Sequence, residues 1–189
     1  MTTKIALFGT SADPPTTGHQ KILSWLSQNF DNVAVWASDN PFKDHQTPLE
    51  HRQTMLWLLI QDITPKRENI ALYPELSSPR SIITVEEAKQ KWPEAEFTLV
   101  IGSDLVNQLP RWYRIEELLQ QVKLLIIPRP GYAIDNFALL QKLTEMGAFF
   151  DIANIKGPAV SSTAFREKGA SEVLTAPVED YIHKQQLYV

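Results

Sequence analysis

The chain has 189 residues, of which 43% are hydrophobic, 21% charged and 10% aromatic, and its formal net charge is −4. This composition excludes a disordered chain and argues against a general nucleic-acid scaffold, although a local basic pocket for a small anion is compatible with it. The chain contains no cysteine, which excludes disulfides, cysteine–zinc sites and thiol nucleophiles.

The first residues lead directly into an apolar run without the pattern of a signal peptide, and no apolar stretch approaches the length of a membrane span. The four histidines are scattered and lack the paired spacing of a metal site. We therefore expect one cytoplasmic domain over residues 1–189, with no membrane or nucleic-acid partner and no metal site built from its own side chains. A homo-oligomer is left open.

Short, mostly continuous apolar runs alternate with helical patterns along the chain. Continuous apolar runs are typical of strands that are buried on both faces of a parallel sheet. We expect strands over 5–8, 33–37, 70–73, 97–101, 124–127 and 149–155. Helices are expected over 19–30, from 48 onward, and over 84–92, 115–121, 137–146 and 178–185. The alternation predicts a Rossmann-like, doubly wound α/β fold: a mainly parallel sheet with helices on both faces and ligands at the carboxyl ends of its strands.

Two of the expected helices begin with a capping-box pattern. Thr47-Pro-Leu-Glu50 places a proline at the first helical position, and Thr84-Val-Glu-Glu87 repeats the spacing. In such a box the first residue accepts from the backbone of the fourth, and the fourth reaches back. We therefore expect Thr47 and Thr84 to be N-cap residues.

The loop after the first expected strand is constrained. Gly9 and Thr10 end the strand, Thr17 is a plausible N-cap, and Gly18 and His19 fall in the first turn of the next helix. A helix start exposes unpaired N–H groups and favours phosphate, which Gly18 would admit and His19 could contact as a donor. The loop is neither a G-x-G-x-x-G motif nor a Walker loop. Taken alone, an ordinary connection with a surface histidine explains it equally well.

A second polar loop follows the last expected strand. It runs from residue 157 to 167 and contains Ser161, Ser162, Thr163 and Arg166 near a helix start. Hydroxyl groups, backbone amides and a guanidinium together can bind phosphate. A serine-rich cap with a surface arginine is the better explanation for this loop alone. Two such loops at strand ends of one sheet favour a nucleotide polyphosphate held between them.

The two loops together resemble the signatures of the H/T-x-G-H nucleotidyltransferases, as Thr16-Thr-Gly-His19 and Val160-Ser-Ser-Thr-Ala-Phe-Arg166. Within that superfamily the chain is similar to the bacterial nicotinate mononucleotide adenylyltransferases, nearly end to end. Further segments that carry the resemblance are Asn40-Pro-Phe-Lys43, Glu50-His-Arg-Gln-Thr-Met-Leu56, Ile101-Gly-Ser-Asp104 with Trp112, Ile127-Pro-Arg-Pro-Gly-Tyr132, and the tail from Val178 to Tyr188.

The resemblance implies adenylyl transfer from ATP to nicotinate mononucleotide in NAD biosynthesis, giving nicotinate adenine dinucleotide and pyrophosphate, with Mg²⁺ bridging substrate phosphate oxygens. It assigns site residues in three groups. The catalytic group is His19, Thr16, Lys43 and Arg166. The ATP-binding group is Gly9, Thr10, Ser11, Gly18, Gly102, Asp104, Ser162 and Thr163. The group for the pyridine nucleotide is Trp112, Arg80, Ser81, Thr84 and Arg129.

The chain also departs from the family pattern. Thr16 stands where a first histidine is usual, as in phosphopantetheine adenylyltransferases, and Thr10 and Ala12 are further changes. Arg80 stands where a tyrosine near the pyridine ring is usual. It could pair with the nicotinate carboxylate or the mononucleotide phosphate, or be a solvated loop arginine. The alternatives are an adenylyltransferase for nicotinamide mononucleotide or phosphopantetheine, and a nucleotide-binding module without turnover.

Two of the assigned residues also have ordinary structural explanations. Asp104 directly follows an expected strand and could serve as a helix N-cap instead of accepting a hydrogen bond from a ribose hydroxyl. Trp112 could pack in the core instead of stacking on the pyridine ring. The spacing in the sequence leaves both choices open.

Overall fold

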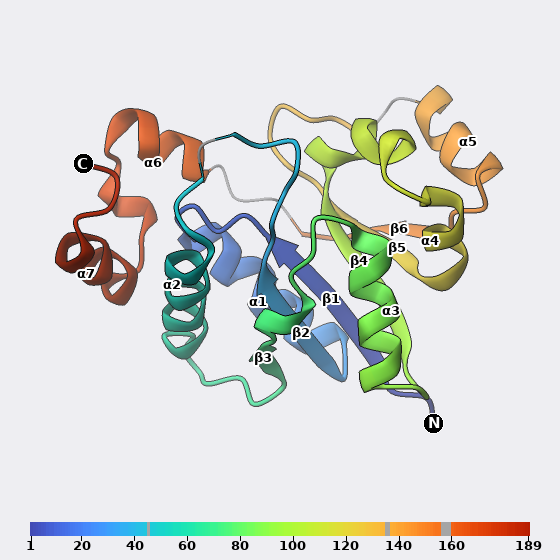
Figure 1. Ribbon diagram of the computed structural model, residues 1–189, viewed down its shortest axis with the longest axis horizontal. Helices are drawn as coiled ribbons and strands as arrows, with labels where there is room; N and C mark the ends of the chain where they lie inside the picture. The colour runs from blue at the N-terminus through green and yellow to red at the C-terminus, as the bar shows by residue number, and fades with distance from the viewer. Residues whose placement is uncertain (45, 135–136, 156–159) are drawn as a thin grey trace.

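The computed structural model describes residues 1–44, 46–134, 137–155 and 160–189 (Figure 1). Its centre is a six-stranded sheet with the strand order β3-β2-β1-β4-β5-β6, in which every neighbouring pair is parallel. The expected doubly wound α/β fold is therefore confirmed. The strands are β1 (Lys4–Thr10), β2 (Asn32–Ala37), β3 (Ile70–Leu72), β4 (Glu96–Gly102), β5 (Lys123–Ile127) and β6 (Phe150–Ile152).

The last strand is shorter than expected. The apolar run predicts a strand over 149–155, whereas β6 covers only Phe150–Ile152 at the edge of the sheet. The side chains of Phe149 and Ile152 are 76% and 47% exposed. An edge strand has a hydrogen-bonding neighbour on one side only, so pairing with β5 determines its length.

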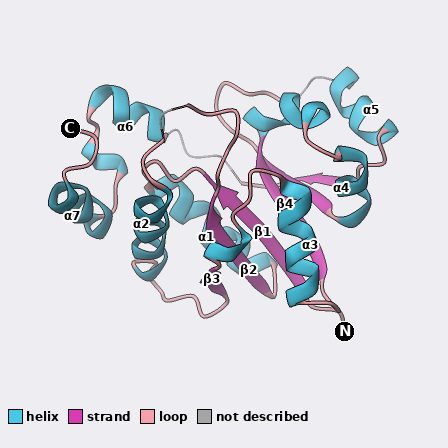
Figure 2. Ribbon diagram, viewed as in Figure 1, coloured by secondary structure: helices cyan, strands magenta, loops and turns pink. Residues whose placement is uncertain are grey.

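Helices cover both faces of the sheet (Figure 2). Buried side chains place α1, α2 and α7 on one face and α3, α4 and α5 on the other. The helices are α1 (Thr17–Asn29), α2 (Leu49–Gln61), α3 (Ser81–Lys91), α4 (Ile115–Gln121), α5 (Phe137–Glu145), α6 (Ser162–Lys168) and α7 (Ala176–Gln185), with 3-10 turns at η1 (Pro74–Leu76), η2 (Ser103–Arg111) and η3 (Ser171–Val173). None of the helices in the described part of the chain is long and apolar enough to cross a membrane.

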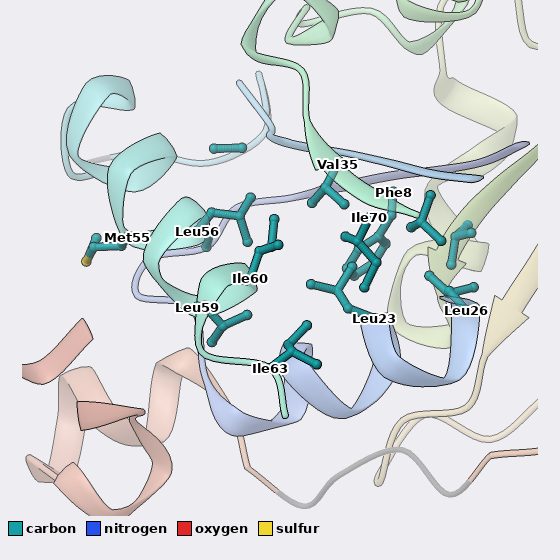
Figure 3. Close-up of a cluster of buried hydrophobic side chains, with 14 of the residues drawn as sticks. Phe8, Leu23, Leu26, Val35, Met55, Leu56, Leu59, Ile60, Ile63 and Ile70 are labelled. Atoms are coloured by element: carbon teal, nitrogen blue, oxygen red, sulfur yellow. The ribbon is translucent and has the colours of Figure 1, made fainter. Parts of the chain in front are cut away.

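Strand β1 connects the two apolar layers. Its Ala6 and Phe8 belong to the layer with α1 and α2, and its Ile5 and Leu7 belong to the layer with α3 and α4. This alternation follows from the two-residue period of a strand, and burial on both faces explains the continuous apolar run. Figure 3 shows side chains of α1 and α2 in the first of these layers. Full burial of each such side chain stabilises the fold by roughly 1.5–3 kcal/mol.

The caps differ from the expected ones at three helices. Thr47 precedes the N-cap of α2, which is Pro48. Thr84 lies inside α3, which begins at Ser81, and its hydroxyl donates to the carbonyl oxygen of Leu76 over 2.7 Å. The N-cap of α1 is Thr16, one residue before the expected Thr17. In the first two cases bonds outside the expected box replace it: the backbone N–H of Thr47 donates to Asp13, and the hydroxyl of Thr84 donates to η1.

The sheet has its topological switch point between the neighbouring strands β1 and β4. From β1 the chain continues to β2 on one side, and from β4 it continues to β5 on the other side. The loops after β1 and β4 separate there and leave a crevice at the carboxyl edge of the sheet. The loops that carry the predicted site residues meet at this edge.

Candidate active site

A cleft of about 700 Å³ lies at the carboxyl edge of the sheet. Every residue assigned above to catalysis, to ATP or to the pyridine nucleotide lines this one cleft. Residues 157–159 of the late loop lie outside the described residues. The cleft therefore brings together side chains from the loops after β1, β2, β4 and β5 and from α3 and α6.

The ring of His19 is held by the cap of its own helix. Thr16 and His19 form a capping box at the start of α1, a pattern in which the residue at the third helical position reaches back to the cap. The backbone N–H of Thr16 donates to Nδ1 of His19 over 2.9 Å, and the Thr16 hydroxyl lies 3.0 Å from the same nitrogen. Thr16 is 1% exposed, so its contribution is to orient the imidazole.

This contact determines which ring nitrogen carries the proton. A backbone N–H can only donate, so Nδ1 of His19 must be an acceptor and the proton of the neutral ring lies on Nε2. Nε2 is 3.0 Å from the hydroxyl of Thr10. Burial, together with the charges of Arg129 and Lys43, lowers the pKa of His19 to about 4. The ring is partly open to the cleft, where it presents a neutral N–H donor.

Lys43 carries a positive charge into the cleft from the loop after β2. Its Nζ donates to the hydroxyl of Ser11 over 2.8 Å. The residue is exposed at the cleft, and partial desolvation together with the charge of the nearby Arg166 lowers the pKa of Lys43. Lys43 and Arg166 thus stand close enough to repel each other, which favours an anion between them.

The late loop is joined directly to the loop after β1. The hydroxyl of Ser162 donates to the carbonyl oxygen of Pro14 over 2.7 Å, and the guanidinium of Arg166 donates to the carbonyl oxygen of Asp13 and to the hydroxyl of Thr163. Ser161 is the N-cap of α6 and accepts from the backbone of Ala164. The two motifs that the sequence separates by more than a hundred residues therefore form one wall of the cleft.

Close backbone approach explains two glycines in the cleft. A Cβ at Gly9 would lie 2.6 Å from the indole of Trp36, and a Cβ at Gly102 would lie 2.3 Å from Oδ1 of Asp104. Asp104 is not a helix N-cap, because the N-cap of η2 is Gly102. One oxygen of Asp104 pairs with Arg129 over 3.1 Å, and the other is buried and has no hydrogen-bond partner among the described residues. That second oxygen faces the backbone of Gly102 and not the open cleft.

Arg129 lies on the His19 side of the cleft, since it pairs with Asp104 and its charge lowers the pKa of His19. The other residues assigned to the pyridine nucleotide come from different elements. Arg80 and Ser81 stand at the start of α3, and Trp112 follows η2. Trp112 lines the cleft and also packs on the core of the α3 and α4 layer, so its two explanations are compatible.

Three residues that support the cleft loops were missed by the sequence analysis. Asp13 is 6% exposed and accepts from the hydroxyl of Tyr188 over 2.6 Å. Burial, and after it the bond to Asp13, raises the pKa of Tyr188 well above its ordinary value, so the hydroxyl stays protonated. Arg52 is 3% exposed and donates to the carbonyl oxygens of residues 11, 38 and 47. Arg52 and Tyr188 lie in two segments that carry the family resemblance, but nothing in the sequence indicated the contacts that they make.

Comparison with known proteins identifies the family. Residues 7–168 match the cytidylyltransferase-like family. The chain belongs to this family. It is 44% identical over 198 residues to a probable nicotinate-nucleotide adenylyltransferase of Synechocystis, with 98% of each chain covered, and 27% identical to the nicotinate-nucleotide adenylyltransferase of Bacillus subtilis, again with 98% of each covered.

The same fold occurs in a solved structure. The Plasmodium falciparum nicotinic acid mononucleotide adenylyltransferase complexed with NaAD superposes with a TM-score of 0.81 at 22% identity, covering 98% of this chain and 97% of that chain. Among the described residues of this cytidylyltransferase-like protein, no group of three or more acidic or histidine side chains could hold a metal ion.

The bond between Tyr188 and Asp13 is expected to support nucleotide binding from the far end of the chain. Tyr188→Phe removes a hydrogen bond to a carboxylate while keeping the ring packed on Phe165. We expect a loss of roughly 1.5–3 kcal/mol in the free energy of unfolding and a weaker affinity for ATP, the ligand that the resemblance implies for this loop. Urea unfolding and calorimetric titration measure the two quantities.

The matched control is Tyr181→Phe. Tyr181 also lies in the C-terminal region and forms a 2.8 Å hydrogen bond, but its partner is His51 and not the loop after β1. We expect Tyr181→Phe to lower stability and leave ATP affinity unchanged. Equal ATP affinity in wild type and Tyr188→Phe would contradict the supporting role of Tyr188.

The lowered pKa of His19 should make stability depend on pH. Because the folded ring has a pKa of about 4 and the unfolded ring one of about 6.5, the unfolded chain binds the extra proton between these values. Stability should therefore fall as pH drops from about 6.5 to about 4, by roughly 2–3 kcal/mol for this group. His19→Asn lacks the titration. The difference in unfolding free energy between wild type and His19→Asn should therefore change between about pH 6.5 and about pH 4. If the two plots of unfolding free energy against pH run parallel over this range, the lowered pKa of His19 is contradicted.

Proposed function

We propose that this protein transfers the adenylyl group of ATP to nicotinate mononucleotide, releasing pyrophosphate and forming nicotinate adenine dinucleotide. The observation that carries the proposal is the cleft, in which a neutral imidazole donor, Lys43 and Arg166 stand around one space with Trp112 in its lining. The similarity to nicotinate-nucleotide adenylyltransferases over 98% of the chain supports the choice of acceptor.

The reaction needs no general base from the protein. The phosphate of a mononucleotide has a second pKa near 6, so it is mostly a dianion at neutral pH and can attack the α-phosphorus of ATP itself. The P–O bond to the leaving pyrophosphate breaks as the new P–O bond forms. This agrees with the state of His19, whose Nδ1 is occupied by its cap and whose Nε2 carries a proton. The contribution of the protein is orientation and charge stabilisation.

Each polar group of the cleft then has a role. The Nε2–H of His19 would exchange its contact with the Thr10 hydroxyl for a phosphate oxygen near the reacting phosphorus. Thr16 holds the ring, and Lys43 lies near enough for its charge to act on the ring. Arg166, with the hydroxyls of the α6 segment, would bind the phosphates that leave as pyrophosphate. Asp104, whose side chain is partly exposed in the cleft lining, would accept from a ribose hydroxyl.

Mg²⁺ fits this site as part of the ATP complex. The described residues offer no acidic or histidine cluster to hold the ion alone, and Mg²⁺ commonly keeps its waters and binds substrate phosphates. When bound, the ion would neutralise charge on the phosphate oxygens. Lys43 and Arg166 supply the remaining positive charge from the protein.

Pyrophosphate release from ATP with each acceptor tests the proposal. We expect release with nicotinate mononucleotide and much less with nicotinamide mononucleotide or phosphopantetheine. A preference for another acceptor would show that the proposed substrate is wrong. Release of no pyrophosphate with any acceptor would favour a nucleotide-binding module without turnover.

The same assay tests the role of His19. We expect His19→Ala to lower kcat by about 10²–10³, the cost of one lost donor to developing charge, while the fold persists. His183→Ala is the matched control, since His183 is exposed on α7 and does not line the cleft. A His19→Ala enzyme within threefold of wild type would contradict the assigned role.

A further inference from the structure

Three arginines lie near the aromatic rings at the Trp112 end of the cleft. Cζ of Arg80 lies 4.2 Å from the centroid of the Tyr113 ring, and Cζ of Arg114 lies 6.0 Å from the same ring. Cζ of Arg111 lies 5.7 Å from the ring of Phe42. Guanidinium groups at these distances are attracted to the ring faces, which orients them without neutralising their charge. The three differ in what else they contact.

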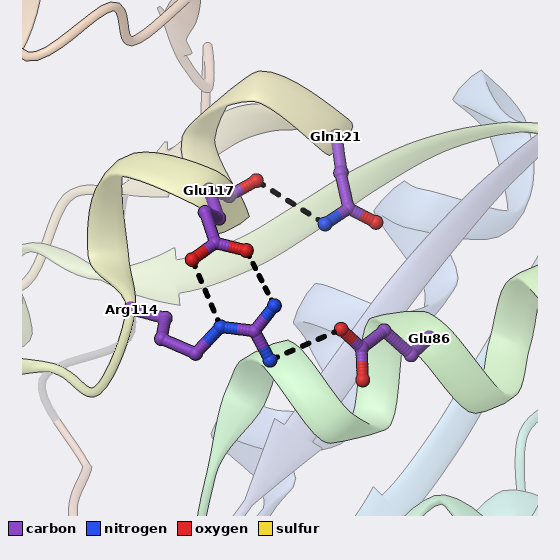
Figure 4. Close-up of polar contacts among 4 residues, drawn as sticks. All are labelled: Glu86, Arg114, Glu117 and Gln121. Atoms are coloured by element: carbon purple, nitrogen blue, oxygen red, sulfur yellow. Dashed lines mark hydrogen bonds and ion pairs between the residues drawn. The ribbon is translucent and has the colours of Figure 1, made fainter.

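The charge of Arg114 is neutralised by carboxylates. Its guanidinium forms two hydrogen bonds to Glu117, one of them 3.0 Å long, and lies 3.4 Å from Glu86 (Figure 4). This arrangement links the start of α4 to α3 on the outside of the protein. Arg114 is absent from the cleft lining. Arg114 therefore has a structural role, and its charge is already neutralised by these two carboxylates.

Arg80 and Arg111 differ from Arg114 both in their position and in the absence of a carboxylate partner among the described residues. Both line the cleft, and within the described part of the chain neither forms an ion pair with an acidic side chain. A guanidinium that stacks on a ring keeps its edge N–H groups free for a planar, two-oxygen acceptor. An uncompensated pair of cations at one end of a substrate cleft favours an anion there.

The position of Arg80 is well defined. It is the N-cap residue of α3, and its carbonyl oxygen accepts from the backbone N–H groups of Ile83 and Thr84. Its own N–H donates to the hydroxyl of Ser78. The backbone is thus fixed by the helix start and the side chain by Tyr113, so the guanidinium is pre-oriented at little entropic cost.

The same cleft also contains the groups assigned to phosphate, namely His19, Lys43 and Arg166. The resemblance assigns the pyridine ring to Trp112, and Arg80 stacks on Tyr113, the next residue in the chain. We propose that Arg80 binds the carboxylate of the nicotinate ring and thereby selects the acid over the amide, with Arg111 as a second cation of the same end. This inference rests on the proposed function and adds to it the residue that determines which pyridine nucleotide is used.

The test compares nicotinate and nicotinamide mononucleotides as acceptors, by kcat/KM, in wild type, Arg80→Gln and Arg114→Gln. We expect wild type to prefer the nicotinate form. Arg80→Gln should lower kcat/KM for that form by roughly 10- to 100-fold and leave the value for the amide within about threefold, because only the acid presents a charged acceptor. Arg114→Gln removes another exposed arginine near the same ring and should leave the preference unchanged. Thermal unfolding of each variant confirms that the fold persists.

The outcomes separate this inference from the proposed function. An unchanged preference in Arg80→Gln would overturn the role of Arg80, and so would an equal fall for both acceptors, which would place Arg80 on the shared phosphate. A wild type that uses both forms equally would overturn selection by Arg80 while leaving adenylyl transfer in place. A wild type that uses neither form would overturn the proposed function and this inference with it.

Discussion

One hydrogen bond determines the chemistry of the cleft: the backbone N–H of Thr16 donates to Nδ1 of His19. Because that donor is part of a helix cap, the start of α1 fixes the tautomer and direction of the imidazole at the same time. The remaining ring proton lies on Nε2, in the cleft. Burial and the neighbouring cations keep the ring neutral. A helix start, which also favours phosphate, thus carries a donor of fixed orientation.

The loop that carries this cap is itself supported from distant parts of the chain. Tyr188 holds the Asp13 carboxylate, Arg166 holds the Asp13 carbonyl, and Arg52 holds the carbonyl of Ser11. The C-terminal helix packs beside α2 on the same face of the sheet as α1. Positioning in the cleft therefore depends on the whole of that layer. Catalysis by orientation and charge requires such support, because small displacements of the reacting groups are costly.

The fold and the placement of the two motif loops could be predicted from the sequence, because continuous apolar runs, helical stripes and short connections all indicate the same topology. The starts of α2 and α3 could not be predicted, since Thr47 and Thr84 bond to residues outside their expected capping boxes. Asp13 and Tyr188 were missed for the same reason: a pair 175 residues apart leaves no local signal. Arg114 is neutralised by carboxylates, whereas Arg80 has no acidic partner in the described part of the chain; this contrast likewise required the folded chain.

The most direct test of this account is a long-range ¹H–¹⁵N NMR spectrum of the His19 ring nitrogens, recorded from about pH 5 to about pH 8. The account predicts a neutral ring throughout, with an unprotonated Nδ1 and a protonated Nε2, and the same tautomer with ATP bound. Protonation of both nitrogens near the ordinary histidine pKa of about 6.5, or a proton on Nδ1, would contradict it.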